Sequence, residues 1–221
     1  MKKAFLIAAL SFFAIQNSAL AKTEGSYIGI DLLNSKAKFV EKYTNDNNKN
    51  EASNTPHHSN SGYGAGLHYN YAINFGGLFI SPGVLLEQNN VKVNGYSNNT
   101  IDIDSQRLQI KNRYGIKSDI GYDFTDKFSV YATGGYAYIS YRTKDYSDLD
   151  GKVTGIKNGI GGSWFYGAGI KIDCDKTSSV NLEFNTQNFS AKTKIINSYL
   201  NLSARYQTRL DVVKVGYSYR F

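Results

Sequence analysis

The chain has little cysteine, proline or histidine, and no long apolar run beyond its N-terminus. Cys174 is the only cysteine among 221 residues, so no intramolecular disulfide can form. We interpret Cys174 as a small buried or turn residue rather than a nucleophile. The mean hydropathy is −0.40, and no stretch after the N-terminus resembles a membrane helix. These absences exclude a disulfide-stapled scaffold and a helical membrane protein.

The N-terminus predicts export. Lys2 and Lys3 precede a mostly apolar run over residues 4–15, and Ala19-Leu20-Ala21 forms a small-residue cleavage site. This order is typical of a secretory signal peptide, which predicts residues 1–21 as the signal and 22–221 as the mature domain. The alternative, an uncleaved anchor, is disfavoured because a membrane span needs about 20 apolar residues.

Abundant glycine and tyrosine, with 14% aromatic residues, favour β-structure. The last nine residues alternate, with Val213, Val215, Tyr217, Tyr219 and Phe221 on one parity, which indicates a strand with one apolar face. Residues 108–123 alternate as well. Their apolar parity holds Leu108, Ile110, Tyr114, Ile116, Ile120 and Tyr122, and the other holds Gln109, Lys111, Arg113, Lys117, Asp119 and Asp123. A face this charged cannot pack against a dry core, so we expect lipid outside and polar filling inside.

The remaining alternating segments predict eight strands joined by connections of alternating length. Short turns are expected at residues 74–77, 123–127 and 174–179, and long polar loops at 41–61, 88–106, 143–162 and 188–207. This order predicts an all-β fold, an eight-stranded antiparallel transmembrane β-barrel. Pro82 falls within a strand, which predicts a bulge at Pro82-Gly83. The strand at 128–142 leaves its facing open, because apolar residues occur on both parities.

Three motifs carry a family resemblance: Tyr217-Ser218-Tyr219-Arg220-Phe221, the run from Gly121 to Asp126, and the run from Gly134 to Tyr138. They resemble small eight-stranded outer-membrane barrels of the opacity-type adhesin and OmpX-like kind, over essentially the whole mature chain. The resemblance implies a bacterial outer-membrane location, extracellular loops and periplasmic termini. It also implies that Tyr217, Tyr219 and Phe221 form the signal read by the barrel-assembly machinery.

Residues on the polar parity of each strand are expected to point into the barrel. There they could fill the interior or line a channel. The residues assigned to the interior are Glu87, Lys111, Arg113, Lys117, Asp119, Lys171 and Glu183. An eight-stranded barrel is only just wide enough for its own side chains, so we expect paired charges that close the lumen.

The sequence predicts no enzyme, cofactor or metal site. Small outer-membrane lipid-modifying enzymes use a His with a Ser and an acid, but His57 and His58 fall in a polar loop and no serine stands two residues from His68. A soluble ligand-binding barrel is a further alternative, disfavoured by the terminal Phe221, the order of the connections and the charged inner parity.

The long loops are therefore the expected binding surface. The fourth contains or precedes Lys192, Lys194, Arg205 and Arg209, and no acidic residue occurs from Asn188 to Leu210. This pattern predicts an adhesin that binds an acidic host glycan or receptor. The alternative is that the loop neutralises phosphates of outer-membrane lipid and lipopolysaccharide. A structural barrel or small porin stays open; the protein is expected to be a monomer that binds no nucleic acid.

Overall fold

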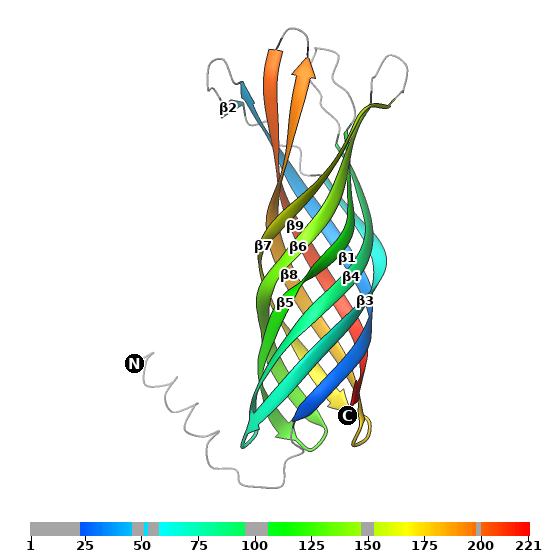
Figure 1. Cartoon of the computed structure of the whole chain (residues 1–221), viewed down its shortest axis with the longest axis vertical. Coiled ribbons are helices and arrows are strands. Elements are labelled where there is room, and N and C mark those ends of the chain that lie inside the picture. Colours follow the sequence, from blue (N-terminus) through cyan, green and yellow to red (C-terminus); the bar gives the residue numbers. More distant parts are fainter. Residues whose placement is uncertain (1–22, 46–50, 53–57, 96–105, 147–152, 198–199) are drawn as a thin grey trace, which may run out of the picture.

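The computed structural model describes residues 23–45, 51–52, 58–95, 106–146, 153–197 and 200–221, so the predicted signal peptide lies outside the described residues. Eight long strands dominate: β1 Gly25–Asn45, β3 His58–Phe75, β4 Leu78–Gly95, β5 Gln106–Thr125, β6 Phe128–Tyr146, β7 Val153–Asp173, β8 Ser178–Asn197 and β9 Leu200–Arg220. A two-residue strand, β2 (Glu51–Ala52), pairs with β1. Each long strand is antiparallel to the next, and β1 also pairs with β9, which closes the barrel (Figure 1). The predicted eight-stranded antiparallel barrel is confirmed.

The tight turns and the C-terminus lie at one end of the barrel, here called the terminal end; the other is the distal end (Figure 1). Gly76 and Gly77 have φ values of 71° and 104°, a conformation that favours glycine, and the Gly77 N–H donates to Asn74 Oδ1 at 2.9 Å. The turn between β7 and β8 is held by Asp175, whose Oδ1 accepts the Thr177 N–H at 2.7 Å. Both turns were expected from their residue types.

Where the structure describes the predicted long polar loops, they are strand, and that part of the prediction is wrong; residues 46–50, 53–57, 96–105, 147–152 and 198–199 lie outside the described residues. β4 continues to Gly95, β8 to Asn197, and β9 begins at Leu200. The long strands have 18–21 residues, whereas a membrane-spanning strand needs about 9–11. The barrel wall therefore continues well past the length that a bilayer requires.

The apolar side of the wall changes along the barrel. In β1, Ile28, Ile30 and Leu32 point outward and are 52–72% exposed, whereas further along Lys36 and Lys38 are the outward, exposed residues. The distal interior is an apolar cluster instead: Leu33, Ala37, Phe39, Val91, Val93, Leu108, Ile110, Ile139, Tyr141, Phe189, Leu210 and Val212. The charged interior predicted for the whole barrel is thus concentrated in its terminal half, although Thr143 and Thr208 are buried beside the apolar cluster. Polar residues cover the distal outside, which made these segments resemble loops.

A bulge at Lys111 reverses the facing of β5. Its pairing with β6 moves from Ile110↔Tyr141 to Asn112↔Ser140, which leaves Lys111 as an extra residue. Leu108 and Ile110, predicted to face lipid, are therefore buried inside at 3% and 0% exposure. Lys111 is only half-buried and does not join the interior polar residues, contrary to its assignment.

The bulge predicted at Pro82-Gly83 is absent. Ser81, Pro82 and Gly83 pair in unbroken register with Asp119, Ser118 and Lys117 of β5. Towards β3, the pairs on either side of Pro82, Asn70↔Gly83 and Ile73↔Ile80, keep one register. The strand accommodates the proline by giving up ladder pairs with β3, not by inserting a residue.

The facing of β6, which the sequence left open, is settled by its buried residues. Tyr131, Ile139 and Tyr141 lie inside, and Val130 and Tyr138 are exposed outside.

Candidate functional site

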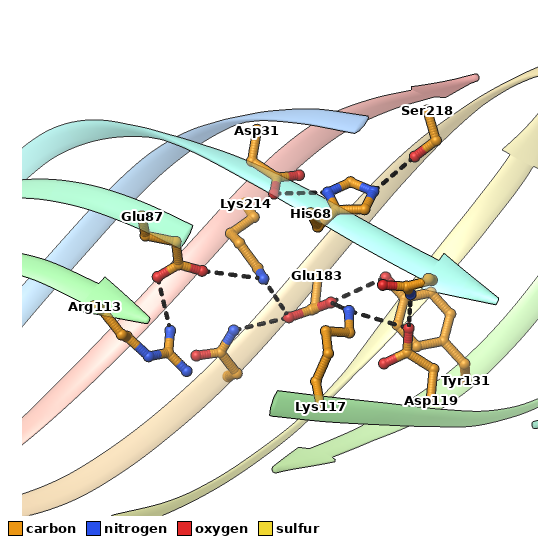
Figure 2. Close-up of polar contacts among 12 residues, drawn as sticks. Asp31, His68, Glu87, Arg113, Lys117, Asp119, Tyr131, Glu183, Lys214 and Ser218 are labelled. Atoms are coloured by element: carbon orange, nitrogen blue, oxygen red, sulfur yellow. Dashed lines mark hydrogen bonds and ion pairs between the residues drawn. The ribbon is translucent and has the colours of Figure 1, made fainter. Parts of the chain in front are cut away.

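A network of buried charges crosses the lumen in the terminal half (Figure 2). Glu87 accepts hydrogen bonds from Arg113 Nη1 at 3.0 Å and from Lys214 Nζ at 3.3 Å. Glu183 lies 2.8 Å from Lys214 Nζ and 3.2 Å from Lys117 Nζ, and Lys117 is also 3.0 Å from Asp119. Carboxylates and cations therefore balance within the network.

The network brings together most of the residues assigned to the interior. Glu87, Arg113, Lys117, Asp119 and Glu183 are all buried members. Lys214 joins them although the sequence analysis did not single it out. The Arg113 guanidinium also lies 4.5 Å from the centre of the Phe165 ring. These contacts fill the lumen at this level.

Lys171 lies apart from the network, nearer the terminal end. Its Nζ donates to Thr23 Oγ1 at 2.5 Å and is 3.6 Å from Asp173. Thr23 in turn donates its N–H and hydroxyl to Asp123, at 2.8 and 2.7 Å. These bonds hold Thr23 against Asp123 of β5 and Lys171 of β7 at the terminal end of the barrel.

A second constellation, here called the trio, consists of Asp31, His68 and Ser218. His68 Nδ1 is 2.9 Å from Asp31 Oδ2, and His68 Nε2 is 2.9 Å from Ser218 Oγ. All three side chains are buried, and Figure 2 shows the imidazole between the carboxylate and the hydroxyl. This is the order acid, base, hydroxyl.

The trio depends on strand register and on one glycine. Gly29 of β1 pairs with both His68 of β3 and Ser218 of β9. A Cβ on Gly29 would lie 2.4 Å from the His68 ring and 2.8 Å from Ser218 Oγ. Because Gly29 has no side chain, the imidazole can reach across β1 to the serine.

Sequence reasoning missed Ser218 because it looked for a serine beside His68 along the chain. The two residues are 150 positions apart and meet only because β1 closes the barrel against β9. The usable signal was positional: Asp31, His68 and Ser218 are polar residues of inward parity on three strands adjacent in the closed sheet.

A small cavity of about 50 Å³ adjoins the trio. Its wall includes His68, Ser218, Asn181 and Lys171, and Thr23 lines it at the terminal end. Since one ordered water needs about 10–15 Å³ of cavity volume, the cavity can hold a few waters or a small chemical group.

The outer wall carries a separate concave surface of about 410 Å³ over β8, β9 and β1, here called the basic groove. It is lined by Lys38, Asn188, Phe189, Ser190, Gln207, Thr208 and Arg209. Lys38 and Arg209 are cross-strand partners, and Arg209 Nε donates to Asp211 Oδ1 at 2.8 Å.

The other predicted ligand residues continue these strands. Lys192 of β8 is paired with Arg205 of β9, and Lys194 with Ser203; the side chains of Lys192, Lys194 and Arg205 lie outside the described part. In the closing strand, Tyr217 and Tyr219 face outward at 48% and 49% exposure, and Phe221 is 70% exposed.

Within the described residues, no group of three or more His, Cys, Asp or Glu side chains is arranged to hold a metal ion. In the same part of the chain no helix is long and apolar enough to cross a membrane.

The family is decided by a match of residues 5–221 to the model of the outer membrane protein beta-barrel domain. The chain belongs to this family. Its place is therefore the bacterial outer membrane, and the resemblance to small outer-membrane barrels is confirmed. A search of curated proteins finds no match.

Solved structures of bacterial proteins are similar to this chain at low identity. The outer membrane protein OprG of Pseudomonas aeruginosa is 12% identical, with 90% of this chain and 96% of OprG covered and a TM-score of 0.62. The outer membrane protease OmpT of Escherichia coli is 10% identical, covering 93% and 99%, with a TM-score of 0.50. The attachment invasion locus protein Ail of Yersinia pestis is 14% identical, covering 90% and 100%, with a TM-score of 0.43.

Proposed function

We propose that this outer-membrane barrel is an opacity-type attachment protein, which binds an acidic glycan or receptor of a host surface through its distal end. In this proposal the signal peptide is removed, the termini lie in the periplasm, and the distal end faces the outside. The outward aromatic residues Tyr217, Tyr219 and Phe221 would serve assembly. Attachment itself needs no chemistry, so this role is non-enzymatic.

The observation that carries the proposal is the basic groove on a wall that extends beyond the apolar band. Lys38 and Arg209 lie side by side in the β1–β9 ladder, and both are exposed. A guanidinium has five N–H donors, and Asp211 takes the Nε of Arg209, so the fork retains capacity for an anion. The strands continue towards Lys192 and Arg205, which adds cationic residues along the same two strands.

Phosphates of outer-leaflet lipopolysaccharide are the competing occupant of the groove. Val213, an exposed apolar residue of β9, is only four positions from Arg209, or about 13 Å along the strand. The groove is therefore near the level where headgroups begin. The length of the wall favours attachment, because a barrel that bound only membrane lipid would need no such extension.

The test compares charge removal at the groove with the same removal elsewhere. Bacteria or beads that display the protein should lose binding to host cells when Lys38 and Arg209 are both changed to Ser. In the matched control, Lys92 of β4 and Arg107 of β5 are both changed to Ser. This variant should bind as the wild type does. Binding should also fall between 0.1 and 1 M salt, where the Debye length drops from about 10 Å to about 3 Å.

A wild-type protein that does not attach would leave the alternative, a structural outer-membrane barrel. Equal loss of binding in both double variants would indicate a response to net charge rather than to the groove.

A further inference from the structure

We propose that Asp31, His68 and Ser218 form a nucleophilic site, in which Ser218 accepts short acyl groups from esters that enter through the terminal mouth. The inference goes beyond attachment and does not depend on it. In the orientation proposed above, this mouth opens to the periplasm.

The geometry meets the first requirement, a base held against a nucleophile. In the tautomer that donates its Nδ1–H to Asp31, the imidazole presents Nε2 as the acceptor for the Ser218 hydroxyl, and both separations are 2.9 Å. The carboxylate fixes the ring and stabilises the imidazolium that forms when the proton moves.

Two glycines clear the space that the trio occupies. Gly29 lies under the imidazole, as described above. A Cβ on Gly216 would lie 2.3 Å from Asp31 Oδ1, so this position also excludes side chains.

The adjoining cavity supplies the second requirement, a place for the reacting group beside side chains that donate hydrogen bonds. Ser218 and His68 line its wall together with the Lys171 ammonium and the Asn181 amide. A cation and an amide in the wall of the same cavity would favour the negative charge that develops on an attacked carbonyl oxygen.

The size of the cavity sets the class of substrate. About 50 Å³ admits an acetyl-sized acyl group and excludes the long acyl chains of lipids, since drug-sized ligands occupy pockets of about 300–1,000 Å³. The alcohol portion of the ester would remain towards the mouth, next to Thr23.

The chemistry is acyl transfer. Ser218 Oγ attacks the ester carbonyl carbon while its proton passes to His68 Nε2. The bond from carbon to the leaving oxygen then breaks, and the leaving alcohol takes the proton from His68. Water repeats the sequence on the acyl-serine, which releases the carboxylic acid and restores the hydroxyl. No oxidant, reductant or metal enters the balance.

The experiment uses the full mature barrel in detergent with p-nitrophenyl acetate. We expect a burst of p-nitrophenol close to one per protein, and one acetyl group that peptide mass mapping places on Ser218. Ser218→Ala should lose the burst and the adduct. His68→Gln should slow acylation by about 100-fold or more, the usual contribution of a general base. Ser35→Ala is the matched control, because Ser35 is a buried lumen serine that does not line this cavity, and it should retain the burst.

Folding of each variant is checked by its faster migration on gels when unheated. Should Ser218→Ala not fold, mapping of the wild-type adduct still decides, because it needs no variant. An acetyl group found only on lysines or tyrosines, or no burst at all, would overturn the proposal, as would an unchanged burst in folded Ser218→Ala.

Discussion

At the scale of single residues, glycines determine where the large polar side chains of the lumen can lie. Gly29 is the clearest case, since both His68 and Ser218 occupy the space beside it. Gly29→Ala should destabilise the barrel by about 1–3 kcal/mol, the usual cost of overpacking a filled interior. Urea unfolding in lipid vesicles measures this. Gly134→Ala is the control, because the nearest atom to its Cβ would be 3.8 Å away. Equal stability of the two variants would contradict the close packing of the trio.

The turn residue Asp175 predicts a pH effect. Hydrogen bonds from the Ser178 hydroxyl and from Thr177 hold the pKa of the Asp175 carboxyl well below its ordinary value. A depressed folded-state pKa contributes stability above the unfolded pKa of about 3.9, and this contribution is lost as pH falls through the folded value. Asp175→Asn should therefore be less stable than the wild type at pH 7, and the difference should shrink in acid. Unfolding measured across that range checks it; a difference that is constant with pH would show that Asp175 has no such coupling.

At the scale of the strands, the extra residue Lys111 decides which side chains reach the core. Deletion of Lys111 would turn Leu108 and Ile110 outward, or force the strand to realign. Burying one such side chain contributes about 1.5–3 kcal/mol, so the deletion should cost several kcal/mol. Lys111→Ala keeps the residue count and should change stability by less than about 0.5 kcal/mol, as is usual for surface substitutions. A deletion variant as stable as Lys111→Ala in urea would show that the bulge does not fix the register.

Outward positions of the apolar band give a second test at this scale. Ile116 is 64% exposed on the outer wall, where lipid surrounds it. Ile116→Arg should cost about 2–4 kcal/mol if the site is near the bilayer midplane. Ile156→Arg is a useful contrast, because Ile156 is also exposed but lies near the distal start of β7, and it should cost much less. If both variants lose similar stability when unfolded from vesicles, the bilayer does not surround Ile116 at its midplane while leaving Ile156 outside.

The strands also show what the sequence could and could not predict. Alternation identified all eight strands, the turn at Gly76-Gly77 and the outward facing of Ile116. It failed beyond the apolar band, because an outward residue is apolar only where lipid surrounds the wall. Further along, the strands continue with outward polar residues such as Lys36 and Lys38, which face water. It also failed at Lys111, where one extra residue exchanges inside and outside without changing the parity of the apolar residues. The trio needed the pairing of β1 with β9, which no local pattern encodes.

At the scale of the whole molecule, the lumen is filled at two levels by different kinds of side chain. The terminal half contains the balanced charge network, and the distal half contains the apolar cluster around Phe39 and Ile110. Packed apolar side chains exclude water, and paired charges that are hydrogen-bonded to one another occupy the space an ion would need. We therefore expect either level alone to block conduction.

This two-level filling leads to the last prediction, which concerns conductance in planar bilayers. The wild type should show no openings or only very small ones. Arg113→Ala removes the largest fully buried side chain of the charge network and should destabilise the barrel by about 3–5 kcal/mol, because Glu87 loses a partner. It should nevertheless stay closed, since the apolar cluster is untouched. Steady nanosiemens openings in the wild type would restore the porin alternative. Openings that appear only in Arg113→Ala would instead show that the charge network closes the lumen by itself and that the distal cluster leaves a path for ions.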